Sequence, residues 1–156
     1  MKALVIYDSA FGNTEKIAQA ISQTLGGELK FVKETDHTKL KGIDLLVVGS
    51  PTQGGQATKP LQEFLNKIPD GALKNTKVVS FDTRISAKQQ AGWWLSALAQ
   101  LVTGIFGFAA PRIAKSLESK GGILIAEPEG FIVEGTKGPL APSELDRAKT
   151  WAKKLL

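Results

Sequence analysis

The sequence of 156 residues contains no cysteine and only one histidine, His37. The absence of cysteine excludes disulfide bonds, thiolate metal sites, iron–sulfur clusters and cysteine nucleophiles. It is also compatible with a reducing compartment, so we expect a cytoplasmic protein. A single histidine cannot form a multi-histidine metal site. We therefore expect no metal centre, and no side chain stands out as a catalytic residue.

Clustered basic charge is also missing from the sequence. The chain has 20 basic and 15 acidic side chains, a net charge of +5, and its lysines are spread along its length. Nucleic-acid-binding domains concentrate basic residues within a recognisable module, so we expect no nucleic-acid partner. The apolar run at the amino terminus is short and is interrupted by Asp8. We therefore expect no signal peptide.

Apolar runs alternate with amphipathic stretches along the whole chain. A run that is apolar throughout is typical of a parallel strand covered on both faces, and a periodicity of 3.6 indicates a helix. The expected strands are 2–8, 28–34, 43–50, 76–82 and 122–127, and the expected helices are 13–27, 59–68, 111–122 and 143–156. This alternation predicts an α/β fold, with a three-layer doubly wound five-stranded parallel sheet in a single domain, 1–156.

Residues 9–14 join the first expected strand to the first expected helix. Ligands of open parallel sheets bind at the carboxyl ends of the strands, and a helix N-terminus attracts anions. Gly12 permits a positive φ, and Ser9, Asn13 and Thr14 add side-chain donors. The alternative is that Asn13 or Thr14 only caps the helix. The stretch has neither a Walker lysine nor a GxGxxG pattern, so neutral donors would hold a phosphate.

Residues 5–14 follow the pattern aliphatic-aliphatic-Tyr-x-Ser-x-x-Gly-x-Thr, with alanine at 18 and isoleucine at 21. This composite pattern resembles the flavodoxin signature. The resemblance implies strand order 2-1-3-4-5 and an FMN cofactor at the switch point. The phosphate would be bound by Ser9, Ala10, Phe11, Gly12, Asn13 and Thr14. Phe11 stands where many flavodoxins have a hydroxyl residue, which removes one phosphate donor.

The resemblance also assigns two later loops to the flavin ring. Pro51, Thr52, Gln53, Gly54 and Gly55 would cover one side of the ring, without the aromatic residue that many flavodoxins have there. A peptide at Gly54 or Gly55 would flip on flavin reduction so that its carbonyl accepts the N5–H bond, unless the pair is a plain turn. Asp82, Thr83 and Arg84 would meet the pyrimidine end. Arg84 either pairs with Asp82, contacts the flavin or is solvated.

Two segments look like insertions, near 86–110 and 128–142. Residues 91–110 carry no charge, and we expect a third helix that packs on the sheet. Alternatively, Trp93, Trp94, Phe106 or Phe108 covers the flavin, or the segment exposes an apolar patch for a partner, a homodimer or a membrane surface. Residues 128–142 are rich in glycine and proline. We expect a hairpin-like excursion there, packed against the first insertion.

Three functions follow from this interpretation. The leading one is an FMN-binding electron-transfer protein that shuttles electrons between redox partner proteins. The second is an FMN-dependent NAD(P)H:quinone-type reductase, which needs an open flavin face. The third is a flavin-free interaction module with the same fold, which Phe11 and the altered ring loops favour.

Overall fold

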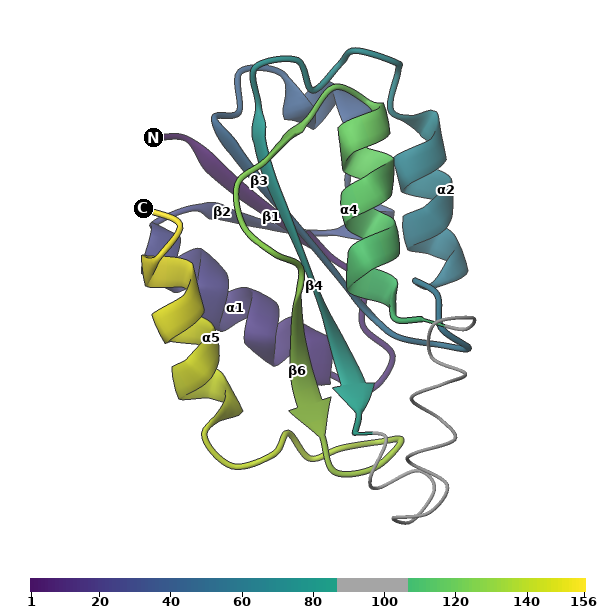
Figure 1. Ribbon diagram of the computed structural model, residues 1–156, viewed down its shortest axis with the longest axis vertical. Coiled ribbons are helices and arrows are strands. Elements are labelled where there is room, and N and C mark those ends of the chain that lie inside the picture. Colours follow the sequence, from purple (N-terminus) through teal and green to yellow (C-terminus); the bar gives the residue numbers. More distant parts are fainter. Residues whose placement is uncertain (87–106) are drawn as a thin grey trace.

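The computed structural model describes residues 1–86 and 107–156. One parallel sheet forms its centre, with strand order β2-β1-β3-β4-β5 and with β6 also paired to β4 (Figure 1). The strands are β1 (Ala3–Tyr7), β2 (Glu28–Phe31), β3 (Leu45–Pro51), β4 (Lys77–Ile85), β5 (Ile123–Leu124) and β6 (Glu129–Val133). The doubly wound order expected from the sequence is confirmed.

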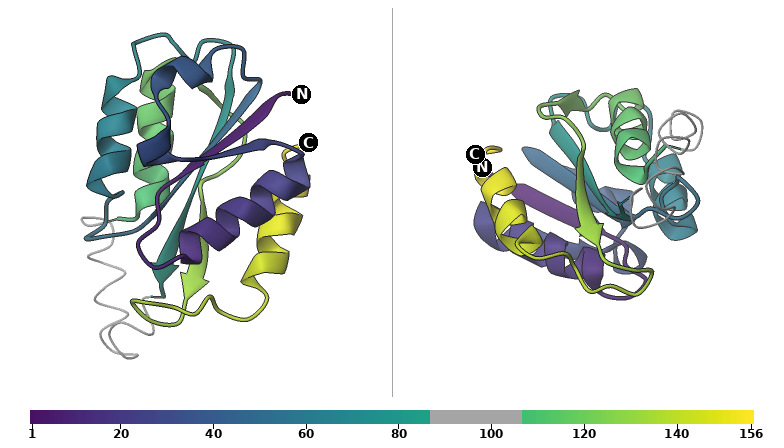
Figure 2. Two further views of the ribbon diagram at one scale, coloured as in Figure 1. Left: turned by 180° about the vertical axis from the view of Figure 1, so that it is seen from behind. Right: turned by 60° about the horizontal axis from the view of Figure 1, so that its bottom comes forward.

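Helices cover both faces of this sheet. The helices α1 (Asn13–Leu25) and α5 (Glu144–Lys153) lie on one face, and α2 (Lys59–Lys67) and α4 (Ala109–Ser119) lie on the other (Figures 1 and 2). Two short 3₁₀ helices, Val32–Glu34 and His37–Leu40, connect β2 to β3. The three-layer architecture is therefore confirmed.

The alternation of side chains along each central strand builds two separate cores. In β1, Val5 packs with α1 and α5, whereas Leu4 and Ile6 pack with α2 and α4, and all three side chains are fully buried. Burial of such side chains stabilises the fold by about 1.5–3 kcal/mol each. In β3, a Cβ at position 49 would overlap the ring of Phe81. Glycine at this position therefore lets the ring pack directly against the backbone of β3.

The fifth strand differs from the expectation. It was expected over 122–127, but β5 ends at Leu124, and the chain joins β4 again only at Glu129 as β6. Residues 125–128 stand opposite only Val79 and Ser80 of β4, so the chain bulges out of the ladder there. Pro128 lies at the end of this bulge and has no N–H group to donate to a ladder. The expected excursion over 128–142 therefore begins with a strand, and only its later part turns back, through a bridge between Val133 and Leu140.

The predictions for residues 91–106 lie outside the described residues. Among the residues that are described, no helix is long and apolar enough to cross a membrane. The single-domain assignment and the two insertions stay predictions.

The outer edge of β6 is covered by an ion pair from α5. Glu144 is 7% exposed, and its carboxylate accepts the N–H of Ile132 at 2.6 Å and pairs with Arg147 at 2.7 Å. The Arg147 side chain also donates to the carbonyl of Gly130. Burial alone would raise the pKa of Glu144, but the bonds from Arg147 and Ile132 outweigh burial and hold that pKa below its usual range. These contacts replace a neighbouring strand at the sheet edge.

We expect Glu144→Gln to lower the free energy of unfolding by about 1–3 kcal/mol near neutral pH, because the charged acceptor of the Ile132 N–H and of the Arg147 guanidinium is lost. A depressed pKa stabilises the fold above the ordinary pKa of the group, and this contribution disappears as pH falls through the folded-state value. The difference from the unchanged protein should therefore shrink as pH falls from neutral to values below the ordinary glutamate pKa of about 4.3. Urea unfolding across this range measures it.

The matched control is Glu118→Gln, because Glu118 is an exposed residue of α4. It should change stability little at any pH. A destabilisation by Glu144→Gln that stays constant with pH would contradict this account of the edge.

Candidate functional site

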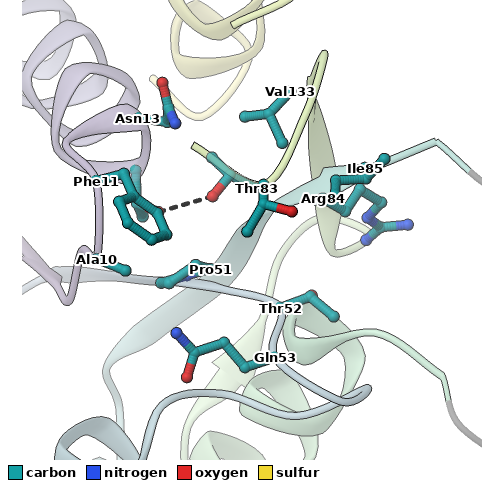
Figure 3. A pocket seen from close by; sticks show the side chains of 12 residues that line it. Ala10, Phe11, Asn13, Pro51, Thr52, Gln53, Thr83, Arg84, Ile85 and Val133 are labelled. Atoms are coloured by element: carbon teal, nitrogen blue, oxygen red, sulfur yellow. Dashed lines mark hydrogen bonds between the residues drawn. The ribbon is translucent and has the colours of Figure 1, made fainter. Parts of the chain in front are cut away.

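The carboxyl ends of β1, β3 and β4 place three loops around one cavity of about 110 Å³ (Figure 3). We call residues 9–14 the first loop and 51–55 the second, and we keep the name third loop for residues 82–84. The structure places residues 82–84 in the last part of β4, paired with β6, because the strand continues to Ile85 instead of ending at 82 as expected. The lining residues are Ala10, Phe11, Asn13, Thr14, Pro51, Thr52, Gln53, Thr83, Arg84, Ile85, Val133 and Thr136. The predicted residues from all three loops thus meet, whereas Ser9, Gly12, Gly54, Gly55 and Asp82 do not line this cavity.

The first loop leaves a set of backbone N–H groups free. The Gly12 N–H donates to Ser9 Oγ at 3.0 Å, and Gly12 has φ 90°. In the first loop and the first turn of α1, five N–H groups have no hydrogen-bond partner among the described residues. They belong to Ala10, Phe11, Asn13, Thr14 and Glu15. They lie at the amino end of α1, where the helix dipole is positive. This arrangement suits an anion.

A buried carboxylate fixes the position of the first loop. Asp8 is 5% exposed, and one of its oxygens accepts the Ser9 N–H at 2.8 Å. Its other oxygen accepts the hydroxyl of Thr58, whose N–H donates to Ser50 Oγ at 3.0 Å. Sequence reasoning missed this role, and the available signal was a lone acidic residue at the end of an apolar strand. The network ties the first loop to the start of α2.

Two side chains of the first loop contact other parts of the protein. Thr14 Oγ1 lies 2.7 Å from Thr83 Oγ1 in the third loop. In such a pair one hydroxyl donates to the other, so one O–H remains to donate to a ligand. The Asn13 amide donates to the carbonyl of Lys137 at 3.2 Å. Whether Asn13 and Thr14 bind phosphate stays a prediction.

The second loop is a tight turn. The Gln53 N–H donates to the Gln56 carbonyl at 2.8 Å, and the Gln56 N–H returns the bond at 3.1 Å. Gly54 and Gly55 between them have φ 57° and 78°, and two positive φ values define a type I′ turn. A Cβ at Gly54 would meet nothing within 4 Å, so the tip is sterically open. The predicted peptide flip stays a prediction.

In the third loop, Arg84 takes the first of its three expected alternatives. Its guanidinium donates to Asp82 at 2.6 and 2.7 Å and lies over the ring of Phe108, 3.7 Å from the centroid. A Cβ at Gly130 would overlap this guanidinium. Asp82 is fully buried and also accepts the Ala110 N–H at 2.9 Å. Asp82 thus anchors the start of α4 rather than facing the cavity.

The family model for the flavodoxin domain matches residues 4–120, more than half of the chain. This chain belongs to the flavodoxin domain family. A flavodoxin from Aquifex aeolicus is 36% identical over 73 residues, which are 43% of this chain and 40% of that protein. An uncharacterized protein from Methanocaldococcus jannaschii is 33% identical over 84 residues, 53% of this chain and 54% of that protein. The chain thus matches about half of the length of these curated relatives.

Solved structures agree with this family at the level of the fold. Flavodoxin 1 from Bacillus cereus has a TM-score of 0.73 and 17% identity, covering 99% of this chain and 96% of that one. A flavodoxin from the domain Archaea gives the same four values. Rubredoxin oxygen:oxidoreductase from Desulfovibrio gigas has a TM-score of 0.70 and 20% identity, covering 97% of this chain but 34% of that one. At these identities the similarity shows the fold alone.

Tyr7 is the last residue of β1 in this flavodoxin domain, and Asp8 separates it from the first loop. Its hydroxyl donates to Glu15 at 2.9 Å, and its ring packs against Phe31 with 5.6 Å between centroids. Burial, the bond to Glu15 and nearby carboxylates raise the pKa of Tyr7 to about 12. A raised pKa stabilises the protonated fold below the ordinary value of about 10. This stabilisation is lost as pH rises through about 12.

Tyr7 is the only tyrosine of the chain, so the absorbance of tyrosinate against pH reports this group alone. We expect a midpoint near 12 in the folded protein, and Glu15→Gln should move it back toward about 10 because a negative charge is removed. Glu63→Gln, at an exposed position of α2, is the control. An equal midpoint in all three proteins would refute the role of Glu15.

Proposed function

We propose that this protein binds FMN and carries electrons between redox partner proteins. The observation that carries the proposal is the set of free N–H groups in the first loop, at the carboxyl edge of a sheet in the flavodoxin order. Membership of the flavodoxin domain family supports the flavin cofactor.

The residues of the first loop fit the phosphate end of FMN. No lysine or arginine lies within residues 9–14, so the dianion would be held by backbone N–H groups, one threonine hydroxyl and the positive end of α1. The φ of 90° at Gly12 lets the backbone turn around the anion. Asp8 contributes indirectly because its carboxylate holds the Ser9 N–H.

The other two loops fit the flavin ring. We assign the second loop to one side of the ring, where the positive φ of Gly54 and Gly55 and the open space at Gly54 would allow a peptide to reorient. The third loop would face the pyrimidine end with backbone groups. The charge of Arg84 is balanced there by Asp82, so the side chains of this loop present little net charge. The bound flavin would supply the electron-transfer chemistry, and the protein would bind it, orient it and exclude water.

An NAD(P)H:quinone-type reductase is the second candidate. Phe11 is the only aromatic residue that lines the cavity in the described part of the chain, so neither ring loop offers a stacking side chain there. An uncovered ring face would admit a nicotinamide. Phe11 is 53% exposed in the cavity wall, at a position where many flavodoxins have a hydroxyl residue that binds the phosphate. The loss of this donor favours the third candidate, a flavin-free module.

Absorption spectra and assays of the purified protein separate these functions. An electron carrier should show a bound-flavin spectrum after FMN is added, and it should reduce acceptors only when a separate reductase is present. Oxidation of NAD(P)H with a quinone by the protein alone would select the reductase. A colourless protein after addition of FMN and gel filtration would overturn both flavin functions.

Gly12→Ala tests the first loop against a matched variant, Gly71→Ala. Both glycines have positive φ, 90° and 78°, and an added Cβ would meet nothing within 4 Å at either site. Each change should therefore destabilise the fold by about 1–2 kcal/mol through backbone strain. Gly71 lies between α2 and the amino end of β4, away from the first loop. Only Gly12→Ala should therefore weaken FMN binding, by about tenfold or more.

Titration of the apoprotein with FMN, followed by quenching of flavin fluorescence, measures this difference. Equal affinities of Gly12→Ala and Gly71→Ala would remove the first loop from the binding site.

A further inference from the structure

A fourth loop, residues 134–140, follows β6 and returns beside the start of α1 (Figure 2). It is closed by its own hydrogen bonds. The Glu134 N–H donates to the Pro139 carbonyl at 2.8 Å, and the Gly138 N–H donates to the Gly135 carbonyl at 3.0 Å. The bridge between Val133 and Leu140 ends the loop. Neither the sequence pattern nor the family resemblance assigned any role to these residues.

The fourth loop rests on the first loop through one buried side chain. Asn13 is 8% exposed, and its amide donates to the Lys137 carbonyl at 3.2 Å. Gly138 has φ 101°, and a Cβ there would lie 2.7 Å from both the amide nitrogen and the amide oxygen of Asn13. A glycine at 138 is therefore required on two counts, the backbone conformation and the close approach to Asn13.

The fourth loop also forms part of the cavity wall. Thr136 of this loop and Val133 at the end of β6 line the same cavity as Thr14 of the first loop and Thr83 of the third. In Figure 3, Asn13 and Val133 lie at one side of this cavity, and Pro51 and Gln53 lie at the other. The site therefore has walls from four loops, and the fourth lies beside the amino end of α1.

We propose that the fourth loop is a wall of the nucleotide site, in which Thr136 contacts the bound flavin nucleotide and Asn13 acts as a positioning residue. The bond from Asn13 to Lys137 sets the distance between the fourth loop and the first loop. This inference rests on the proposed function, because it places FMN in the cavity. The inference changes the expected role of the Asn13 side chain. Its amide group would hold the fourth loop in place and would not bind the phosphate.

The fourth loop contains its own matched pair of variants. Gly138→Ala forces a methyl group against the Asn13 amide, whereas a Cβ at Gly135 would make an ordinary contact of 3.5 Å with the Gly138 carbonyl. Gly138→Ala should weaken FMN binding by about tenfold or more relative to Gly135→Ala. Thr136→Val, which replaces the hydroxyl by a methyl group of similar size, should weaken binding by about fivefold. The affinities come from FMN titration of each apoprotein.

Limited trypsin digestion gives an independent readout that needs no variant. Lys137 is exposed in the fourth loop. Lys41, which precedes the amino end of β3 and lies away from the cavity, is exposed too. FMN contacts should slow cleavage after Lys137, because a ligand that binds the ordered loop lowers the population of its open form. Cleavage after Lys41 should be unchanged. Mass spectrometry of the fragments at fixed times measures both rates.

The outcomes separate this inference from the proposed function. If the unchanged protein binds FMN, but Gly138→Ala and Thr136→Val bind as tightly as Gly135→Ala and FMN does not protect Lys137, the fourth loop is not part of the site and the proposed function stands. If the unchanged protein does not bind FMN, both are overturned. If Gly138→Ala fails to fold, Thr136→Val and the protection of Lys137 decide the question.

Discussion

Two buried carboxylates, Asp8 at the end of β1 and Asp82 in β4, hold the carboxyl edge of the sheet together. A buried charge is costly unless hydrogen bonds satisfy it. Asp8 is satisfied by Ser9 and Thr58, and Asp82 by Arg84 and the start of α4. Each carboxylate therefore requires its partners to stay in place. The two carboxylates do not themselves line the cavity, yet they hold the segments around it in place.

This arrangement explains why an anion is suited to the site although the cavity has little free positive charge. The cation in the wall, Arg84, is paired with Asp82, and the first loop contains no basic residue. Attraction must come from N–H groups and from the dipole of α1, which are fixed by the fold and need no flexible side chain. The net charge of +5 therefore comes from residues outside the first loop.

Most of the fold could be predicted because local patterns and topology agree. The apolar runs in β1, β3 and β4 indicated buried parallel strands, and the pattern around Gly12 and Thr14 located the first loop. The split between β5 and β6 was missed because Pro128 was treated as the end of a strand rather than as a gap in a continuing edge. The pairing of Arg84 with Asp82 was one of three alternatives that the sequence left open.

From the sequence alone, hydrophobic periodicity determined the alternation of strands and helices. The motif over residues 5–14 carried the family resemblance, and this resemblance implied the strand order and the positions of the three loops. Only the tertiary structure decided which side chains meet across those loops. The contact of Asn13 with Lys137 and that of Asp8 with Thr58 join residues far apart in the chain. Such contacts depend on where the sheet and its helices bring separate segments together, and no local pattern encodes that distance.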